Sequence, residues 1–324
     1  MKRVKYIDQV KGIAILLIVL GHIIPDSFLK TWIYTFHVPI FFIINGILIA
    51  KKEKVSKDIN VKKCFFNILY PYFTFSVFVL IKDLLKCILI EKKFISEPLV
   101  NDFVKFFLFE GYGTLWFLPV MFFAEVLFLK IFKNFNYKTT RYILRMSILL
   151  LIILILNKLS IFKYFTKIFI SLFFLSAGYL LERFKNLFQK EINIEILLLI
   201  LLIFIPFSML NGKVDMHYCI YNNLLLYIMI SLINSILIIL IFKNLKLSSK
   251  ALEFFGKNSL IVMITHSVLP VVSVSSFVKK FFDNLIISNA LTFIFTLIFE
   301  VVIIFLTNKY FKFMFSMHKK RKEV

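Results

Sequence analysis

Long apolar segments, separated by short polar connections, most constrain this chain. Ten can be drawn, at residues 10–26, 32–50, 64–90, 114–133, 142–157, 164–182, 194–210, 218–242, 255–278 and 286–311. They are continuous rather than alternating, and the 324 residues include only 8 Gly and 7 Pro, which argues against a β-barrel. Lipid offers the backbone no hydrogen-bond partner, so an open chain must cross it as helices. We predict an all-α, polytopic integral membrane protein with about ten transmembrane helices in a single domain, residues 1–324.

The distribution of positive charge predicts the topology. Lysine and arginine gather at both chain ends and in alternate connections, residues 51–63, 130–145 and 243–257. The other connections are poorer in base; residues 211–217 hold one Lys and one Asp. Basic connections stay in the cytoplasm, so we predict both termini there, in a multi-pass protein of the cell membrane. This bias accounts for most of the formal charge of +22, and we therefore expect no nucleic-acid partner.

The cysteines and the long connection at residues 91–113 give two further predictions. Cys64, Cys87 and Cys219 lie far apart and match no metal or redox spacing, so we interpret them as apolar fillers and predict no metal site. The longest stretch without a continuous apolar run, residues 91–113, is interrupted by Phe103–Phe109. We expect it to form an interfacial or re-entrant segment on the outer face.

The first apolar segment carries the most informative polar residues. Lys11 and His22 are eleven residues apart, which places them on one stripe of a helix, roughly 16 Å apart along its axis. A cation near the cytoplasm and a deeper imidazole suit a long polyanionic donor, with the imidazole as general base toward a hydroxyl. The alternative is that Lys11 anchors the topology and His22 packs between helices.

Other polar residues lie within the apolar segments and are functional candidates because burying them in lipid is costly. Pro39 follows His37 and would free the carbonyl near Thr35, kinking the helix. His37 is alternatively an interfacial residue, and Trp116 part of an aromatic belt. Glu125 and Glu300 also lie within apolar segments, and the alternative to a functional role is that each pairs with a cation. Lys82 and Asp83 are neighbours in the sequence and would neutralise each other.

The order of these motifs resembles the membrane acyltransferase-3 family, the O-acetyltransferases of bacterial surface polysaccharides, including fucose 4-O-acetyltransferase-like proteins. The matching pieces run from residue 7 to 266. They are Ile7-Asp8-Gln9-Val10-Lys11-Gly12-Ile13, Leu20-Gly21-His22, Phe36-His37-Val38-Pro39-Ile40-Phe41-Phe42, Asn45-Gly46, Leu69-Tyr70-Pro71-Tyr72, Leu115-Trp116-Phe117-Leu118, and Gly256-Lys257-Asn258-Ser259-Leu260 with His266.

The resemblance implies a cytoplasmic acyl-CoA donor, acetyl-CoA in the first instance, a carbohydrate hydroxyl acceptor and no bound cofactor. We expect His22 as the catalytic base, with Asp8 orienting Lys11. The expected donor-binding residues are Lys11, Lys62 and Lys63, and the expected acceptor-binding residues are His37, Asn45, Trp116, Asn258 and His266. The chain departs from the family pattern at Lys11, where Arg is usual, at Asn45, more often Ser, and at Met263, commonly aromatic.

The predicted function is therefore a membrane O-acyltransferase that acts on a cell-envelope or exported glycan. A transporter or flippase for a glycan or lipid-linked substrate is the first alternative, since buried His, Asn and Glu also suit a substrate pathway. An inverted repeat would favour a transporter, and none is evident in the sequence. A sensory or racemase-associated membrane module is the second alternative.

Overall fold

The protein was analysed as a computed structural model, which describes residues 3–54, 60–89, 97–111, 113–132, 139–159, 163–184, 192–245, 248–268 and 270–315. In these ranges the regular structure is helical, apart from an isolated bridge between Asp215 and Ile220. Within these ranges nine helices are long and apolar enough to cross a membrane, and the number rises to ten if a bent helix pair is counted as one span. The predicted all-α polytopic fold is confirmed.

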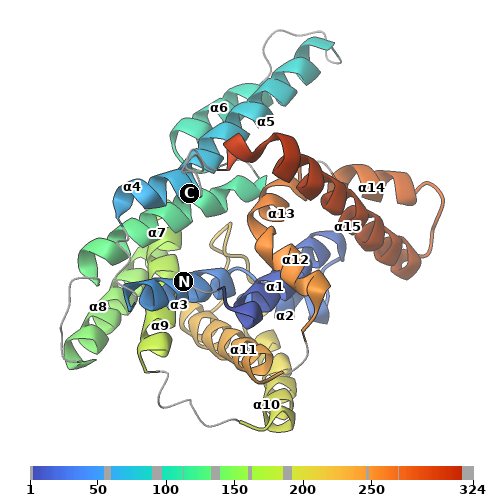
Figure 1. The fold of residues 1–324 in the computed structure, drawn as a ribbon. Coiled ribbons are helices and arrows are strands. Elements are labelled where there is room, and N and C mark those ends of the chain that lie inside the picture. The colour runs from blue at the N-terminus through green and yellow to red at the C-terminus, as the bar shows by residue number, and fades with distance from the viewer. Residues whose placement is uncertain are drawn as a thin grey trace, which may run out of the picture.

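In the described part of the chain, half of the spans are a single helix and the other half consist of two or three helical pieces (Figure 1). In chain order the spans are α1 (Lys5–Ile23); α2 (Phe28–Phe36) with α3 (Pro39–Glu53); α4 (Val61–Cys64), η1 (Phe65–Leu69) and α5 (Tyr70–Leu89); η2 (Gly113–Trp116) with α7 (Phe117–Ile131); α8 (Thr139–Lys158); α9 (Lys163–Arg183); α10 (Ile194–Phe207) with η4 (Ser208–Asn211); α11 (Leu224–Asn244); α13 (Ser259–Thr265) with α14 (Pro270–Val278); and α15 (Leu285–Tyr310). Outside the spans lie α6 (Glu97–Phe107), α12 (Lys250–Lys257) and η5 (Lys312–Met314).

The ends of the spans gather at two opposite faces. At the face of the amino terminus, the Lys51 ammonium lies 3.2 Å from the Glu182 carboxylate, joining the ends of α3 and α9. At the other face, which we call the distal face, Lys213 lies 2.9 Å from Asp26, joining the loops before α11 and α2. If the bent pair counts as one span, ten spans that alternate in direction place the end of α15 on the face where α1 begins.

The structure corrects three predicted boundaries. The first span begins at Lys5 rather than at residue 10. The span predicted at 218–242 begins at Leu224, where the Asn223 side chain caps the helix, and residues before it fold back in a distal loop. The span predicted at 255–278 is not continuous: α12 ends at Lys257, and α13 and α14 meet at a 60° bend.

Proline explains the break in the second span. Pro39 has no N–H to donate to the carbonyl of Thr35, four residues earlier, and the helix stops between α2 and α3. The freed Thr35 carbonyl accepts a hydrogen bond from the Ser231 hydroxyl of α11. The Asn234 amide of α11 also donates to the Thr35 hydroxyl, at 3.2 Å. The predicted release of the Thr35 carbonyl is confirmed, and His37 lies at the break between α2 and α3.

Glycines allow α3 and α9 to pack backbone against backbone over an extensive contact (Figure 1). A Cβ atom on Gly46 would lie 1.9 Å from the Leu175 carbonyl oxygen, and one on Gly178 would lie 1.9 Å from the Ile43 carbonyl oxygen. Without a hydrophobic drive in lipid, helix association depends on such close packing of small residues. The Asn45-Gly46 motif therefore serves in part to bring two helix backbones together.

We expect Gly46→Val to destabilise the protein strongly, because the new side chain meets backbone rather than a movable side chain. Overpacking a core usually lowers the free energy of unfolding by about 1–3 kcal/mol. Because the obstacle here is backbone, we expect a loss at or above the upper end of that range. Thermal unfolding in detergent measures it. Gly21→Ala is the control, since its Cβ would meet the edge of the Tyr34 ring at 3.0 Å, which can rotate away. Equal stability of both variants would contradict the packing argument.

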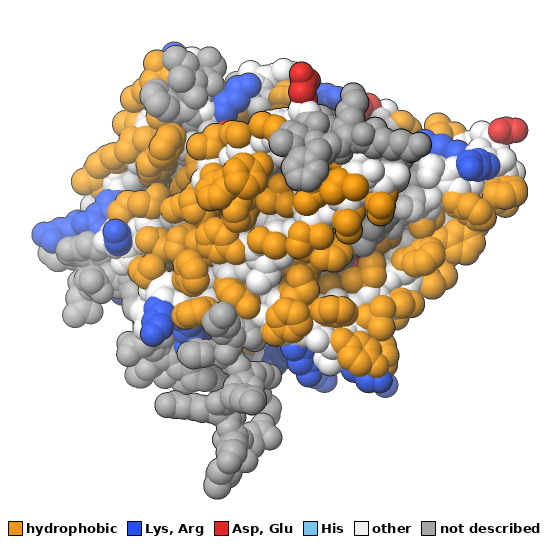
Figure 2. All heavy atoms as spheres, turned by 90° about the horizontal axis from the view of Figure 1, so that it is seen from above, with side chains coloured by type: hydrophobic (Ala, Val, Ile, Leu, Met, Phe, Trp, Pro, Cys, Tyr) orange, Lys and Arg blue, Asp and Glu red, His pale blue; other side chains and the backbone are white. Residues whose placement is uncertain are grey.

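The inner and outer helices differ in what they present to their surroundings. Most of α3, α7, α9 and α11 is buried inside the protein, whereas most of α8, α10 and α15 is not. Exposed Leu, Ile, Val and Phe side chains cover one outer face, with lysine and arginine mostly towards its edges (Figure 2). Such a band matches a lipid-facing surface. In the predicted interfacial segment, α6 has eleven residues and an exposed apolar face that includes Phe103 and Phe107; residues 90–96 and 112 lie outside the described part.

The orientation in the membrane remains a prediction that reporter fusions can test. A fusion at the C-terminus or at residue 57, which lies outside the described residues, should report cytoplasm. A fusion at residue 213 should report the exterior, because it lies on the distal face. Reports of the same compartment from residues 57 and 213 would contradict the ten-span arrangement.

Candidate active site

A cavity of about 980 Å³ opens at the distal face and brings together three of the predicted site residues. His22 reaches it from the last turn of α1, His37 from the break between α2 and α3, and Trp116 from the end of η2. The loop at residues 212–223 supplies the opposite wall with Asp215 and His217. We call this space the distal cavity.

His22 is exposed to the distal cavity, and its ring lies 5.2 Å from the ring of His266, measured between centroids. His266 is fully buried at the end of α13, with Nδ1 2.7 Å from the Val262 carbonyl oxygen. Since a carbonyl only accepts, Nδ1 of His266 carries its proton, and Nε2 lacks a hydrogen-bond partner in the described part of the chain. His37 is held the same way, with Nδ1 2.8 Å from the Ile33 carbonyl oxygen.

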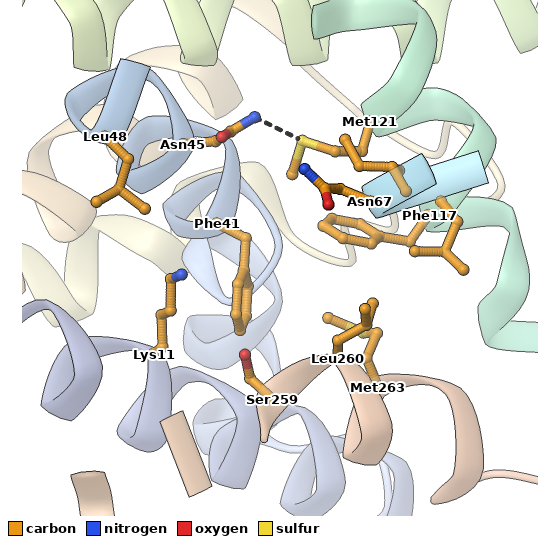
Figure 3. A pocket seen from close by; sticks show the side chains of 12 residues that line it. Lys11, Phe41, Asn45, Leu48, Asn67, Phe117, Met121, Ser259, Leu260 and Met263 are labelled. Carbon is orange, nitrogen blue, oxygen red and sulfur yellow. Dashed lines mark hydrogen bonds between the residues drawn. The ribbon is translucent and has the colours of Figure 1, made fainter. Parts of the chain in front are cut away.

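A second cavity, of about 170 Å³, lies around Lys11 (Figure 3). Lys11 and Ser259 border it on one side, and Asn45 and Asn67 on the other. We call it the lysine cavity. Lys11 is half-buried, and its side chain enters a space whose other walls are largely apolar. An ammonium in such surroundings interacts more strongly with an anion than it would in water.

A π-helical turn positions Asn67 in the lysine cavity. Pro71 cannot donate to the Asn67 carbonyl, and over Phe65–Leu69 the helix widens, so that Tyr70 donates to the carbonyl of Phe65, five residues earlier. Single π-turns of this kind occur often at functional sites. The Leu69-Tyr70-Pro71-Tyr72 motif therefore has a structural consequence at this cavity.

The two cavities meet. Phe117 of α7 and Met263 of α13 line both of them. Lys11 opens into one cavity and His22 into the other, from the same helix, as expected from their spacing of eleven residues. A long substrate held by Lys11 at one end would thus pass Phe117 and Met263 to reach the imidazole of His22.

The buried carboxylates have neutral partners rather than the cations considered from the sequence. Glu125 accepts from the Asn45 amide at 3.0 Å and from the Cys64 thiol at 3.1 Å. Glu300 accepts from the Thr265 hydroxyl at 2.9 Å. Among the described residues neither forms an ion pair, so the expectation of a cation partner is wrong for both. Asn45, predicted to bind substrate, lines the lysine cavity and is oriented by Glu125.

Lys82 and Asp83 are paired as expected, at 3.1 Å. Asp8, by contrast, accepts from Arg3, with Nε of the guanidinium 2.6 Å from Oδ2, rather than from the Lys11 ammonium. Its predicted catalytic role stays a prediction.

Three further predicted residues lie outside both cavities. Lys62 and Lys63 are exposed on α4. The Asn258 side chain donates to the Phe254 carbonyl at 2.8 Å and accepts from Asn308 at 2.9 Å, while its neighbour Ser259 lines the lysine cavity. Their binding roles also stay predictions.

Sequence reasoning missed the polar wall of the distal cavity. Lys105, Lys163, Tyr164, Lys167 and His217 all line it. His217 faces the edge of Trp116 with ring centroids 5.2 Å apart, and Lys167 lies over the same indole at 5.5 Å. The sequence did contain a signal for this wall. Several lysines stand at the predicted outer ends of spans, where the positive-inside rule predicts few basic residues.

The distal loop carries two shifted titratable groups. Asp215 accepts from the backbone N–H of His217 at 2.8 Å, which fixes the turn, and burial raises the pKa of its carboxyl. Burial, with a smaller contribution from the Lys167 charge, lowers the pKa of His217 to about 4. His217 is therefore a neutral imidazole at physiological pH.

Comparison with known proteins decides the family. A family model described as an acyltransferase domain, acyltransferase-3, matches residues 4–309, almost the whole chain. The chain belongs to this acyltransferase family. Neither the curated proteins nor the solved structures that were searched contain a match to it. Membership makes the protein a membrane acyltransferase, and both cavities lie within the matched residues.

Proposed function

We propose that this acyltransferase moves an acetyl group from cytoplasmic acetyl-CoA to a hydroxyl of a cell-envelope or exported glycan. The observation that carries the proposal is the placement of Lys11 and His22 on one helix, each opening into one of two cavities that share Phe117 and Met263. A cation for phosphate and a base for a hydroxyl are the two groups that such a transfer requires.

The sizes of the cavities suit different substrates. Ligand sites commonly have volumes of about 300–1,000 Å³, and the distal cavity, at about 980 Å³, has room for an oligosaccharide end. The lysine cavity, at about 170 Å³, has room for a phosphate at Lys11 with part of the pantetheine arm, but not for a whole coenzyme. The nucleotide would lie outside it, toward the amino-terminal face.

In the proposed reaction the imidazole of His22 takes the proton from the glycan hydroxyl as the oxygen attacks the thioester carbonyl. The new C–O bond forms, the C–S bond breaks, and the departing thiolate takes up the proton to give free coenzyme A. His266 lies against His22 and supports its ring, with its own tautomer set by the Val262 carbonyl. Lys11 holds the donor's phosphates, and Trp116 offers a stacking face to the sugar.

The test is acetyl-CoA consumption by purified protein in detergent or proteoliposomes, with a panel of envelope glycans as acceptors. Release of free thiol that depends on a glycan, together with an ester on that glycan, supports the proposal. Movement of a glycan across the liposome membrane without thiol release would instead support a transporter. Transfer from another acyl-CoA but not from acetyl-CoA would support the proposed acyl transfer and contradict acetyl-CoA as the donor.

A further inference from the structure

We propose that the acceptor is an anionic glycan: a phosphate or carboxylate close to the reacting hydroxyl is bound by Lys167 and the lysines around it in the distal cavity. The inference rests on the proposed function only in treating the bound glycan as the acyl acceptor. The family match does not specify any acceptor charge.

The charges that line the distal cavity are predominantly positive. The lysine, histidine and acidic side chains are Lys82, Lys105, Lys163, Lys167, Glu110, Asp215, His22, His37 and His217. Four lysines thus face two carboxylates. Lys82 is paired with Asp83, and Asp215 is occupied by the backbone of its own loop. His217 is neutral, as its low pKa indicates.

Lys167 is the strongest single observation. Its side chain is more than nine-tenths buried, yet among the described residues no carboxylate lies within ion-pair distance of its ammonium. It lies 5.5 Å from the centre of the Trp116 ring and 5.9 Å from that of Tyr164. Asp215 and Glu110 attract this ammonium only from beyond ion-pair distance. A buried charge without a carboxylate in contact is costly, and one that lines a cavity is a candidate for binding a charge from outside.

Tyr164 adds an independent observation at the same place. Its hydroxyl is buried and has no hydrogen-bond partner in the part of the chain that the structure describes, and the residue lines the distal cavity. A buried donor whose hydrogen bond is not made destabilises the fold unless something binds to it. An oxygen of phosphate or carboxylate beside Lys167 would accept from this hydroxyl and from the ammonium together.

The position of these lysines at the distal face argues against a topological role and against a site for coenzyme A. Topology needs lysine at the cytoplasmic ends of spans, whereas Lys163 and Lys167 stand in the first turns of α9, at the distal face. With the predicted orientation, that face lies away from cytoplasmic coenzyme A, so its phosphates would not reach these lysines. The glycan is the remaining substrate that could bring the negative charge.

Binding can be measured without acyl transfer. The sequence contains two Trp, so Trp32→Phe leaves Trp116, which contacts Lys167, as the only indole reporter. Glucose, glucuronate, glucose 1-phosphate and inorganic phosphate would be titrated against this variant in detergent. We expect the two charged sugars to change Trp116 fluorescence at concentrations at least tenfold lower than glucose. Raising the salt concentration should weaken both, as for any ion-dependent contact.

The decisive comparison uses Lys167→Gln with Lys213→Gln as control. Lys213 is an exposed lysine of the same face, paired with Asp26 and outside the cavity. We expect the preference for charged sugars to fall below threefold in Lys167→Gln and to persist in Lys213→Gln. In turnover assays Lys167→Gln should raise KM for a charged acceptor with a smaller change in kcat.

Three results would overturn the inference. One is equal binding of glucose and the charged sugars. Another is binding of inorganic phosphate as tight as that of glucose 1-phosphate, which would mark a plain anion site. The third is competition by coenzyme A added at the distal face of proteoliposomes. None of these depends on transfer, whereas absence of transfer to any glycan would reject the proposed function alone.

Discussion

His22→Gln should lower the rate of acyl transfer by at least two orders of magnitude while the protein stays folded and inserted. A positioned general base contributes about 10²–10⁴-fold, and glutamine keeps hydrogen bonding but cannot take a proton at neutral pH. His22 is the imidazole of α1, exposed to the distal cavity and on the same helix as Lys11. The measurement is turnover per folded molecule, with binding of a non-reactive acetyl-CoA analogue in parallel, which should persist.

A structural role for His22 predicts a different outcome: loss of folded protein, with normal turnover in what survives. Thermal unfolding of each variant separates the two cases. If His22→Gln retained near-normal turnover, the base would have to be sought at His266 or His37. Both have Nδ1 hydrogen-bonded to a helix carbonyl, which leaves Nε2 as the nitrogen able to take a proton.

Lys11→Ala should raise the KM for acetyl-CoA by about 10–100-fold, with a smaller change for the acceptor. A hydrogen bond to a charged group is worth about 1.5–3 kcal/mol, and each 1.4 kcal/mol is a factor of ten. Lys11→Arg should be close to normal, because either cation binds phosphate. Initial rates at varied donor and acceptor concentrations measure both constants.

Lys5→Ala is the matched control for Lys11, since it removes an exposed lysine from the same helix near the same face. If both variants changed donor and acceptor constants equally, or lowered only the amount of inserted protein, Lys11 would serve the topology and not the donor.

The sequence predicted the spans well because hydropathy is a property of each segment by itself. It failed where a boundary depends on a cap or a distant contact. Residues 218–223 are apolar enough to extend a span, but Asn223 caps α11 and the preceding residues turn back through Asp215. The bend between α13 and α14 did have a local signal, because Pro270, at the start of α14, cannot donate to the carbonyl of His266 four residues earlier. The continuous apolar pattern of residues 255–278 concealed it.

The site was partly predictable for a related reason. Lys11 and His22 share one helix, so their relation follows from helical geometry. The proximity of His22 to His266, of Lys167 to Trp116 and of Asn45 to Glu125 depends on how separate helices pack. Spacing along the chain carries no such information, which is why the lysine-rich wall of the distal cavity and the neutral partners of Glu125 and Glu300 emerged only from the structure.

The meeting of the two cavities at Phe117 and Met263 has an electrical consequence. In the proposed reaction an acyl group passes outward across this partition while the hydroxyl hydrogen passes inward to sulfur. Formally, the acyl group moves as a cation and the hydrogen as a proton, so one positive charge passes in each direction and no net charge crosses. A membrane voltage, worth about 2.3 kcal/mol per charge per 100 mV, would therefore neither drive nor oppose turnover. Had His22 instead released its proton to the distal side, each turnover would separate one charge, and voltage would act on the rate.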